Sequence, residues 1–309
     1  MAPPAPEQQD KVLWFTHPDQ INQIEEIIVP ILKDLENNSL NIIIRLEGSE
    51  RSSVRFQYGV LFAVYQKITL YSSKIDPKLT ANLDLRVYLE HLCDIKKVTN
   101  HFKASIKFIV YENSNLNAVQ KPNVTFQQVK REEEKIFVPE SPLLFSIPDE
   151  ESFDCVALGG TFDHLHSGHK LMLSLAILIS RDRILCGVTA ASEMLKNKNH
   201  PEKLENLENR MLSVQEFFTE FKEGSERKVE IVTLRDPFGP TIELDDLDAL
   251  VVSPETLSGG LKSKQNKIIN SLLFCFVLVN DIRKEIIRIR NSSSRFHCSK
   301  FRRSRRETK

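Results

Sequence analysis

Between residues 153 and 253 the sequence alternates short apolar runs with amphipathic segments of helical length, and this alternation limits the fold more than any other feature. The apolar runs have the length and composition of buried strands: FDCVALGG, RILCGVTA, KVEIVTL and ALVVSPET. The segments SGHKLMLSLAILIS and LENLENRMLSVQEFFTEFK have helical spacing. Strands separated by helices predict a Rossmann-like parallel α/β sheet, with ligands bound at the carboxyl ends of its strands.

A second, smaller domain of α/β or α+β type is expected over residues 1–130, with a role that the sequence leaves open. No group of residues in it points to a chemical reaction. Residues 131–152, charged and with three prolines, are expected to link it to a domain over 153–285. Its expected elements are a helix over 20–38 kinked or split at Pro30, a strand over 40–48, one or two strands over 54–71, a helix over 86–96 and a strand over 104–112.

The composition is that of an ordinary globular protein, with 41% apolar and 27% charged residues. Lys plus Arg and Asp plus Glu both total 42, so a uniformly basic nucleic-acid binder is not expected. The charge is unevenly placed, because residues 283–309 hold eleven basic and two acidic side chains. We expect residues 286–309 to form a basic, disordered tail.

The compartment is indicated by cysteine spacing and by the lack of long apolar runs. Five scattered cysteines, none in a C-x-x-C pair, suit free thiols in a reducing compartment rather than a zinc ribbon or disulfide scaffold. The opening MAPPAPEQQD lacks the apolar core of a secretory signal. The longest apolar run, 272–279, is far shorter than the ~20 residues of a membrane span. These features predict a cytoplasmic or nuclear protein with no membrane span.

The loop after the first strand, GGTFDHLHSGH, is the candidate site. Gly159 and Gly160 allow a tight turn and close approach to a ligand, and the next helix offers free N–H groups and its positive end to an anion. His166 and His169 are three residues apart, so they should share one face and donate to phosphate oxygens.

Two other interpretations of these histidines stay open. They could form a metal site, with Asp163 as the only nearby acid, or they could serve capping and packing alone. The spacing matches no metal-binding signature, so no metal site is expected. Neither a G-x-G-x-x-G dinucleotide loop nor a Walker A loop is present.

The same loop resembles the T/G-x-F-D-x-x-H-x-G-H signature of nucleotidyltransferases with a Rossmann-like fold. Together with GVTAASEMLKNK, ENRMLSVQEFF, DPFGPT and LVVSPETLSGG, residues 153–262 are similar to phosphopantetheine adenylyltransferases of the eukaryotic and archaeal type. The resemblance implies adenylyl transfer from ATP to 4′-phosphopantetheine, giving dephospho-coenzyme A and pyrophosphate. It also implies small-molecule substrates, Mg²⁺ on the triphosphate, and compatibility with a coenzyme A pathway assembly.

The resemblance further assigns roles by position. His169 matches a histidine that stabilises charge on the transferred phosphate, and His166 matches one that helps bind ATP phosphates. Thr161 matches a threonine that orients the attacking phosphate. The other substrate residues are Lys196 or Lys198, between which spacing does not choose, and Arg210. The nucleotide-binding positions are Gly159, Gly160, Phe162, Gly168, Ser253, Glu255, Thr256, Asn280 and Arg283.

The resemblance weakens after residue 262. The segment VNDIRKE, which supplies Asn280 and Arg283, follows a sixteen-residue stretch, SKQNKIINSLLFCFVL, that the family pattern lacks. Three explanations are a genuine loop with a divergent terminus, a translated intron followed by a shifted frame, which we favour, and an inactive member. We expect 263–278 to pack poorly, because a polar block followed by an apolar run matches neither helical nor strand alternation.

Two alternative functions follow from this departure. The chain could be a nucleotidyltransferase acting on another phosphorylated acceptor. It could also be a non-catalytic nucleotide-binding scaffold, because the C-terminal phosphate site is disrupted.

Overall fold

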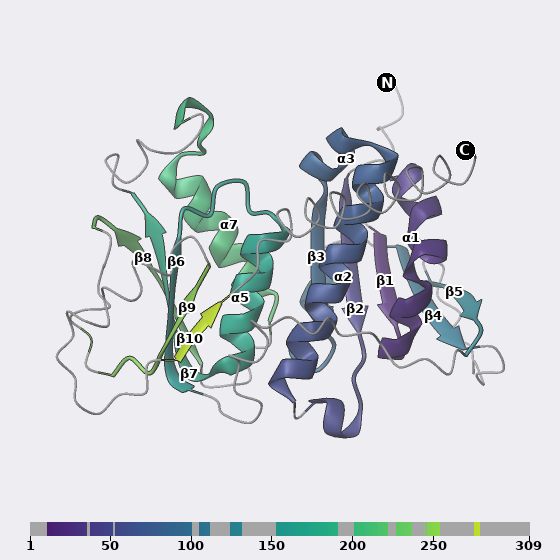
Figure 1. The fold of residues 1–309 in the computed structure, drawn as a ribbon, viewed down its shortest axis with the longest axis horizontal. Coiled ribbons are helices and arrows are strands. Elements are labelled where there is room, and N and C mark those ends of the chain that lie inside the picture. The colour runs from purple at the N-terminus through teal and green to yellow at the C-terminus, as the bar shows by residue number, and fades with distance from the viewer. Residues whose placement is uncertain are drawn as a thin grey trace, which may run out of the picture.

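The chain folds around two five-stranded sheets, each of them wholly parallel among the described strands. The computed structural model describes residues 11–35, 38–51, 53–100, 105–111, 124–131, 153–190, 201–221, 227–236, 244, 246–253 and 275–278. Figure 1 shows the sheets side by side, with helices α5 and α2 between them. The expected α/β class is confirmed, and the first domain is of the α/β rather than the α+β type.

The first sheet has the order β3-β2-β1-β4-β5. Its strands are β1 (Lys11–Phe15), β2 (Ser39–Ile44), β3 (Asp84–Leu89), β4 (Ser105–Tyr111) and β5 (Val124–Val129). The helical elements are η1 (Pro18–Gln23), α1 (Ile24–Lys33), η2 (Gly48–Arg51), α2 (Val54–Ile75), α3 (Pro77–Asn82) and α4 (Ile95–Asn100).

The second sheet has the order β10-β9-β6-β7-β8, which repeats the winding of the first. Its elements are β6 (Phe153–Gly160), α5 (Ser167–Ile179), β7 (Ser180–Thr189), η4 (Pro201–Lys203), α7 (Leu207–Thr219), β8 (Lys228–Leu234), β9 (Ala249–Val252) and β10 (Cys275–Leu278). The strands and helices predicted from the alternation over 153–253 are therefore confirmed. In both sheets successive strands are added first on one side of the first strand and then on its other side, as in doubly wound nucleotide-binding folds.

The expectation of strands over 54–71 is wrong, because this segment lies inside the 22-residue helix α2. The helix begins after Ser53, whose hydroxyl accepts a hydrogen bond of 3.1 Å from the Phe56 N–H. One side of α2 packs on α1 and β3 and another packs on α5. A helix buried on two sides is apolar nearly all round, so its helical period is weak in the sequence.

Two other expectations need correction. Residues 84–89 form strand β3 rather than the start of a helix over 86–96, and Leu85, Val87 and Leu89 lie buried on one face of this strand. Helix α1 continues through Pro30 without splitting. Four residues of the apolar run, Cys275–Leu278, pair in parallel with β9 as an edge strand, and 263–274 lie outside the described residues. The tail at 286–309 lies outside the described residues.

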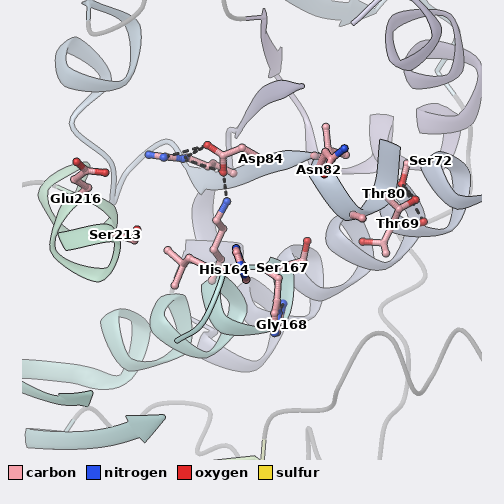
Figure 2. Close-up of a pocket in the computed structure, with 16 residues that line it drawn as sticks. Thr69, Ser72, Thr80, Asn82, Asp84, His164, Ser167, Gly168, Ser213 and Glu216 are labelled. Atoms are coloured by element: carbon pink, nitrogen blue, oxygen red, sulfur yellow. Dashed lines mark hydrogen bonds and ion pairs between the residues drawn. The ribbon is translucent and has the colours of Figure 1, made fainter. Parts of the chain in front are cut away.

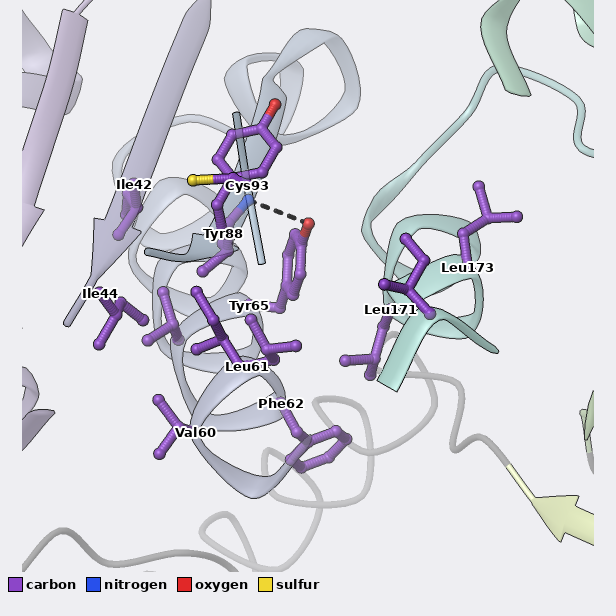
Figure 3. Close-up of a cluster of buried hydrophobic side chains, with 14 of the residues drawn as sticks. Ile42, Ile44, Val60, Leu61, Phe62, Tyr65, Tyr88, Cys93, Leu171 and Leu173 are labelled. Atoms are coloured by element: carbon purple, nitrogen blue, oxygen red, sulfur yellow. Dashed lines mark hydrogen bonds between the residues drawn. The ribbon is translucent and has the colours of Figure 1, made fainter. Parts of the chain in front are cut away.

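One large hydrophobic cluster runs through both sheets and the helices between them, and a smaller one, which includes Ala157 and Leu185, lies in the second sheet. Figure 3 shows Leu171 of α5 facing Phe62 and Tyr65 of α2. The Tyr65 hydroxyl accepts a hydrogen bond of 3.1 Å from the Val87 N–H in β3, so α2 is fixed to the first sheet as well. None of the described helices is both long and apolar enough to cross a bilayer.

Candidate active site at the start of helix α5

The second sheet has its topological switch point between β6 and β9, where doubly wound folds bind ligands. Leu158 of β6 pairs with Val251 of β9. Gly160 lies two residues after Leu158, and Ser253 lies two residues after Val251, so both lie at the carboxyl edge of the sheet. The glycine turn and the histidine motif continue from this edge.

His166 is the N-cap of α5. Its Nδ1 atom accepts hydrogen bonds from the backbone N–H groups of Gly168 and His169, at 3.2 and 3.4 Å. Because Nδ1 accepts, the neutral ring carries its proton on Nε2, which is then a hydrogen-bond donor. Two of the N–H groups at the start of this helix are therefore bound by His166 and are not free for an anion.

The rings of His166 and His169 are stacked, with centroids 3.8 Å apart and planes inclined by 18°. This confirms that the two side chains share one face at the start of the helix. Phe162 lies against His169, with ring centroids 5.3 Å apart, and it is fully buried. The Phe162 side chain therefore supports the ring of His169, and its contact with the nucleotide stays a prediction.

Gly168 leaves room for the capping ring of His166. A Cβ atom at this position would lie 3.2 Å from Cε1 and 3.3 Å from Nδ1 of His166, which is closer than ordinary side-chain contacts. Gly160 is crowded in the same way, because a Cβ there would lie 3.3 Å from the Phe162 ring. Both glycines therefore allow an aromatic ring to lie directly against the backbone.

Arg210 is 3% exposed and holds the carboxyl ends of two strands together. Its guanidinium donates to the carbonyl oxygens of Thr161, Thr189 and Glu205 at 2.7, 2.9 and 3.0 Å. Burial lowers the pKa of this guanidinium, while the carboxylates of Asp163 and Glu205 oppose the shift. Two of its nitrogens, Nε and one terminal nitrogen, therefore hold backbone carbonyl groups, and the contact of Arg210 with substrate stays a prediction.

Thr161 follows β6 directly, and its carbonyl oxygen is the one that Arg210 binds. Its hydroxyl makes no hydrogen bond to any residue that the structure describes, which leaves it available to a ligand at the sheet edge. Ser253 lies partly exposed at the end of β9. Six predicted site residues lie outside the described residues: Lys196, Lys198, Glu255, Thr256, Asn280 and Arg283.

His164, the first histidine of the motif, lies near the carboxylates of Asp163 and Glu205. The His164 N–H donates to the Glu205 carboxylate at 2.7 Å, and the Asp163 carboxylate accepts from the Glu205 N–H at 2.9 Å. This pair of bonds ties the motif loop to the segment before α7. Within the described part of the chain, no three His, Cys, Asp or Glu side chains are grouped as metal ligands.

Lys170, which the sequence did not single out, follows His169 and is 2% exposed. Its ammonium pairs with Asp84 and donates to the Leu85 carbonyl at 3.0 Å, both in β3 of the first sheet. Asp84 also pairs with Arg86 at 3.1 Å, and Arg86 pairs with Glu220 beyond α7. The dashed lines at Asp84 in Figure 2 mark the ion pairs of this carboxylate with Lys170 and Arg86. Charges of alternating sign therefore join the two domains next to the histidine motif.

Burial and pairing act against one another in this charge cluster. Burial alone would raise the pKa of Asp84, but Lys170 and Arg86 outweigh it and the pKa lies below its ordinary value. Burial lowers the pKa of Lys170, and Asp84 opposes that shift. Burial and the Glu220 charge raise the pKa of Tyr88 well above its ordinary value, so its hydroxyl stays protonated and donates to Glu220.

A parallel sheet with a glycine turn at its switch point, and paired histidines at the next helix start, defines a nucleotidyltransferase-type α/β domain. The chain belongs to the cytidylyltransferase-like family, whose profile matches residues 157–296. The match includes the segment with Asn280 and Arg283.

Several relatives are described as phosphopantetheine adenylyltransferases. The one from Saccharomyces cerevisiae is 41% identical over 120 residues, which are 39% of this chain and 38% of that protein. The one from Methanopyrus kandleri is 43% identical over 34% of this chain and 63% of its own length. The one from Methanosarcina barkeri is 34% identical over 41% of this chain and 79% of its own length. The chain thus matches well under two thirds of the yeast protein and just under two thirds of the Methanopyrus one.

Proposed function

We propose that this protein transfers the adenylyl group of ATP to 4′-phosphopantetheine, forming dephospho-coenzyme A and pyrophosphate. The observation that carries the proposal is the stacked pair His166 and His169, 3.8 Å apart at the first turn of α5 and beside the β6–β9 switch point. The names of the archaeal and yeast relatives support the choice of acceptor.

The reaction joins two anions, so the site must neutralise charge and align the reacting groups. A phosphate oxygen of the acceptor attacks the α-phosphorus of ATP, the bond to the bridging α–β oxygen breaks, and pyrophosphate leaves with that electron pair. In this proposal the Nε2–H of His166 donates to an ATP phosphate oxygen, and His169 stabilises the charge that develops on the α-phosphate. The Thr161 hydroxyl orients the attacking phosphate.

The remaining contacts are proposed from the family resemblance. Lys196 or Lys198 grips the acceptor phosphate, and Glu255, Thr256, Asn280 and Arg283 lie near the nucleotide. ATP is proposed to enter as its Mg²⁺ complex, since divalent magnesium commonly binds through substrate phosphates with few protein ligands. Arg210 holds Thr161 in place, and its contact with substrate is proposed from the same resemblance.

Pyrophosphate release from the full chain tests the proposal. We expect release only when MgATP and 4′-phosphopantetheine are both present, with dephospho-coenzyme A as the second product by mass spectrometry. Release with a different phosphorylated acceptor and none with 4′-phosphopantetheine would replace the proposed substrate. ATP binding without pyrophosphate release would indicate a nucleotide-binding scaffold instead.

A further inference from the structure

Lys170 links the first turn of α5 to the first domain. Its backbone N–H donates to the carbonyl oxygen of His166 at 3.0 Å, so it belongs to the same turn as the capping histidine. Its ammonium pairs with Asp84 and donates to the Leu85 carbonyl at 3.0 Å, both at the start of β3. His169 precedes it directly in the sequence. One buried side chain therefore joins the turn that carries both histidines to a strand of the other domain.

The surroundings of Lys170 make a charge at this position unexpected. The residues that follow it in α5, 171–177, are uncharged and buried. An ammonium buried beside them loses its hydration, so an apolar side chain of similar length would pack at least as well. An apolar contact has no preferred direction, however, whereas an ion pair requires one relative position of its two groups. The pair therefore selects one rotation and one height of α5 against β3.

Asp84 is a fixed anchor for this pair. Its backbone N–H donates to the Asn38 carbonyl at 2.7 Å, and its carboxylate also pairs with Arg86 at 3.1 Å (Figure 2). Arg86 in turn pairs with Glu220, which follows α7. Because the carboxylate is held from these sides, α5 cannot rotate without breaking the pair. Helices α5 and α7, which carry the histidines and Arg210, are thus both tied to β3.

We infer that Asp84 is a positioning residue for the histidine pair and acts through Lys170. The ion pair sets the rotation of the first turn of α5, and this rotation sets the direction in which the rings of His166 and His169 face the phosphates. The inference rests on the proposed function for the reaction that the two histidines perform. It gives the first domain a part in the rate of that reaction without contact between Asp84 and the substrates.

A double-mutant cycle on the full chain is the first test. Asp84→Asn and Lys170→Met each break the pair, and either should lower kcat for pyrophosphate release about tenfold, because the histidines lose alignment. The double variant should lose no more than the single variants, since both changes break the same link. Lys170→Met keeps the volume of the buried side chain, so its unfolding temperature should stay near the wild-type value while its rate falls. A pair that only held the domains together would not separate rate from stability in this way.

Glu230→Gln is the matched control. The Glu230 side chain is 40% exposed, close to the 42% of Asp84, and it pairs with Arg183 at 3.1 Å. Both partners lie in the second domain, so this pair does not join the two domains. Breaking it should leave kcat unchanged. An equal loss of rate in Glu230→Gln would show that loss of any such pair has this effect, and it would overturn the inference.

NMR of the histidine rings is the second test and needs no turnover. In the ligand-free protein, labelled on its histidine ring nitrogens, the resonances of His166 and His169 should shift in Asp84→Asn and Lys170→Met but not in Glu230→Gln. Removing an anion and removing a cation change the local field in opposite directions. Shifts of the same sign in the two variants therefore report a common movement of the rings.

The two measurements separate this inference from the proposed function. If the wild-type chain releases no pyrophosphate but the rings shift in the expected pattern, the proposed function fails and the positioning role stands. If wild-type turnover is normal, and the folded Asp84→Asn and Lys170→Met variants keep either the wild-type kcat or the wild-type ring resonances, Asp84 serves only to hold the domains together and the positioning role is wrong.

Discussion

The ammonium group of Lys170, one residue after His169, is ion-paired with Asp84 in the other domain. The lysine is 2% exposed and the aspartate side chain 42% exposed, so the two partners differ in how much they depend on the pair. Loss of the aspartate leaves a buried cation with only the Leu85 carbonyl at 3.0 Å. Loss of the lysine leaves a carboxylate that water and Arg86 still reach.

This asymmetry predicts a clear order of stability. Asp84→Asn should lower the free energy of unfolding by about 1–3 kcal/mol, a value below that for a fully buried pair because the carboxylate is partly solvated. Lys170→Met removes the buried charge and keeps its volume, so it should cost less than about 1 kcal/mol. Urea unfolding of both variants checks the order, and a larger loss for Lys170→Met would contradict it.

The same pair predicts how stability depends on pH. The pKa of Asp84 in the folded protein lies below its ordinary value of 3.8, because the cations Lys170 and Arg86 outweigh the effect of burial. The stabilisation from its charge is therefore complete above its unfolded pKa and is lost as the pH falls through the folded value. The difference in unfolding free energy between the wild type and Asp84→Asn should stay constant from neutral pH to about pH 5 and shrink below about pH 4. A difference that grows on acidification would exclude this assignment.

The histidine pair predicts a loss of turnover without loss of fold. His169→Ala removes the side chain that is proposed to stabilise the transferred phosphate, and losing one such donor typically lowers kcat by about 10²–10³. His169→Asn keeps a neutral donor and should recover part of the rate. Pyrophosphate release measures the rate, and circular dichroism monitors the fold. Near-normal turnover of a folded His169→Ala protein would remove this residue from the mechanism.

A substitution at Gly168 tests whether turnover depends on the position of the His166 ring. Gly168→Ala places a methyl group 3.2 Å from Cε1 of His166, so the ring has to move. A displacement of this kind should lower kcat by about 10- to 100-fold, because the reacting groups lose alignment. Steady-state kinetics check the effect, and an unchanged kcat would show that the ring position is not critical.

Ser174 is a matched position on the same helix. Its hydroxyl is buried with no hydrogen-bond partner among the described residues, and the residue is 2% exposed. Ser174→Ala removes an unsatisfied polar group, so it should leave kcat unchanged and keep or raise the free energy of unfolding by up to about 1 kcal/mol. Thermal unfolding checks this, and a marked destabilisation would mean that the hydroxyl has a partner.

The second sheet was predictable because each of its segments carries its own signal. Strands near 154–158 and 249–252 are short apolar runs, and the apolar segment of α5 has the length of a helix. The motif also placed His166 and His169 correctly, since their spacing sets a shared helical face. These features are local, so one sequence is enough to read them.

The parts that were missed depend on contacts between distant segments. Helix α2 is covered on two sides, so its helical period is hidden in the sequence. Lys170 could have been noticed as a charge inside the apolar segment KLMLSLAILI, but its partner Asp84 is 86 residues earlier in the chain. Nothing local in the first domain indicates that its strand β3 holds the start of α5 through an ion pair.

The two-sided burial of α2 has a consequence for synthesis of the chain. Its second apolar side, with Phe62 and Tyr65, is covered by α5, which includes Leu171 and is translated about a hundred residues later. At about 5–20 residues per second, a ribosome exposes that side for roughly 5–20 seconds before its partner emerges. The nascent first half is therefore a natural substrate for a chaperone, and the first domain expressed alone should aggregate.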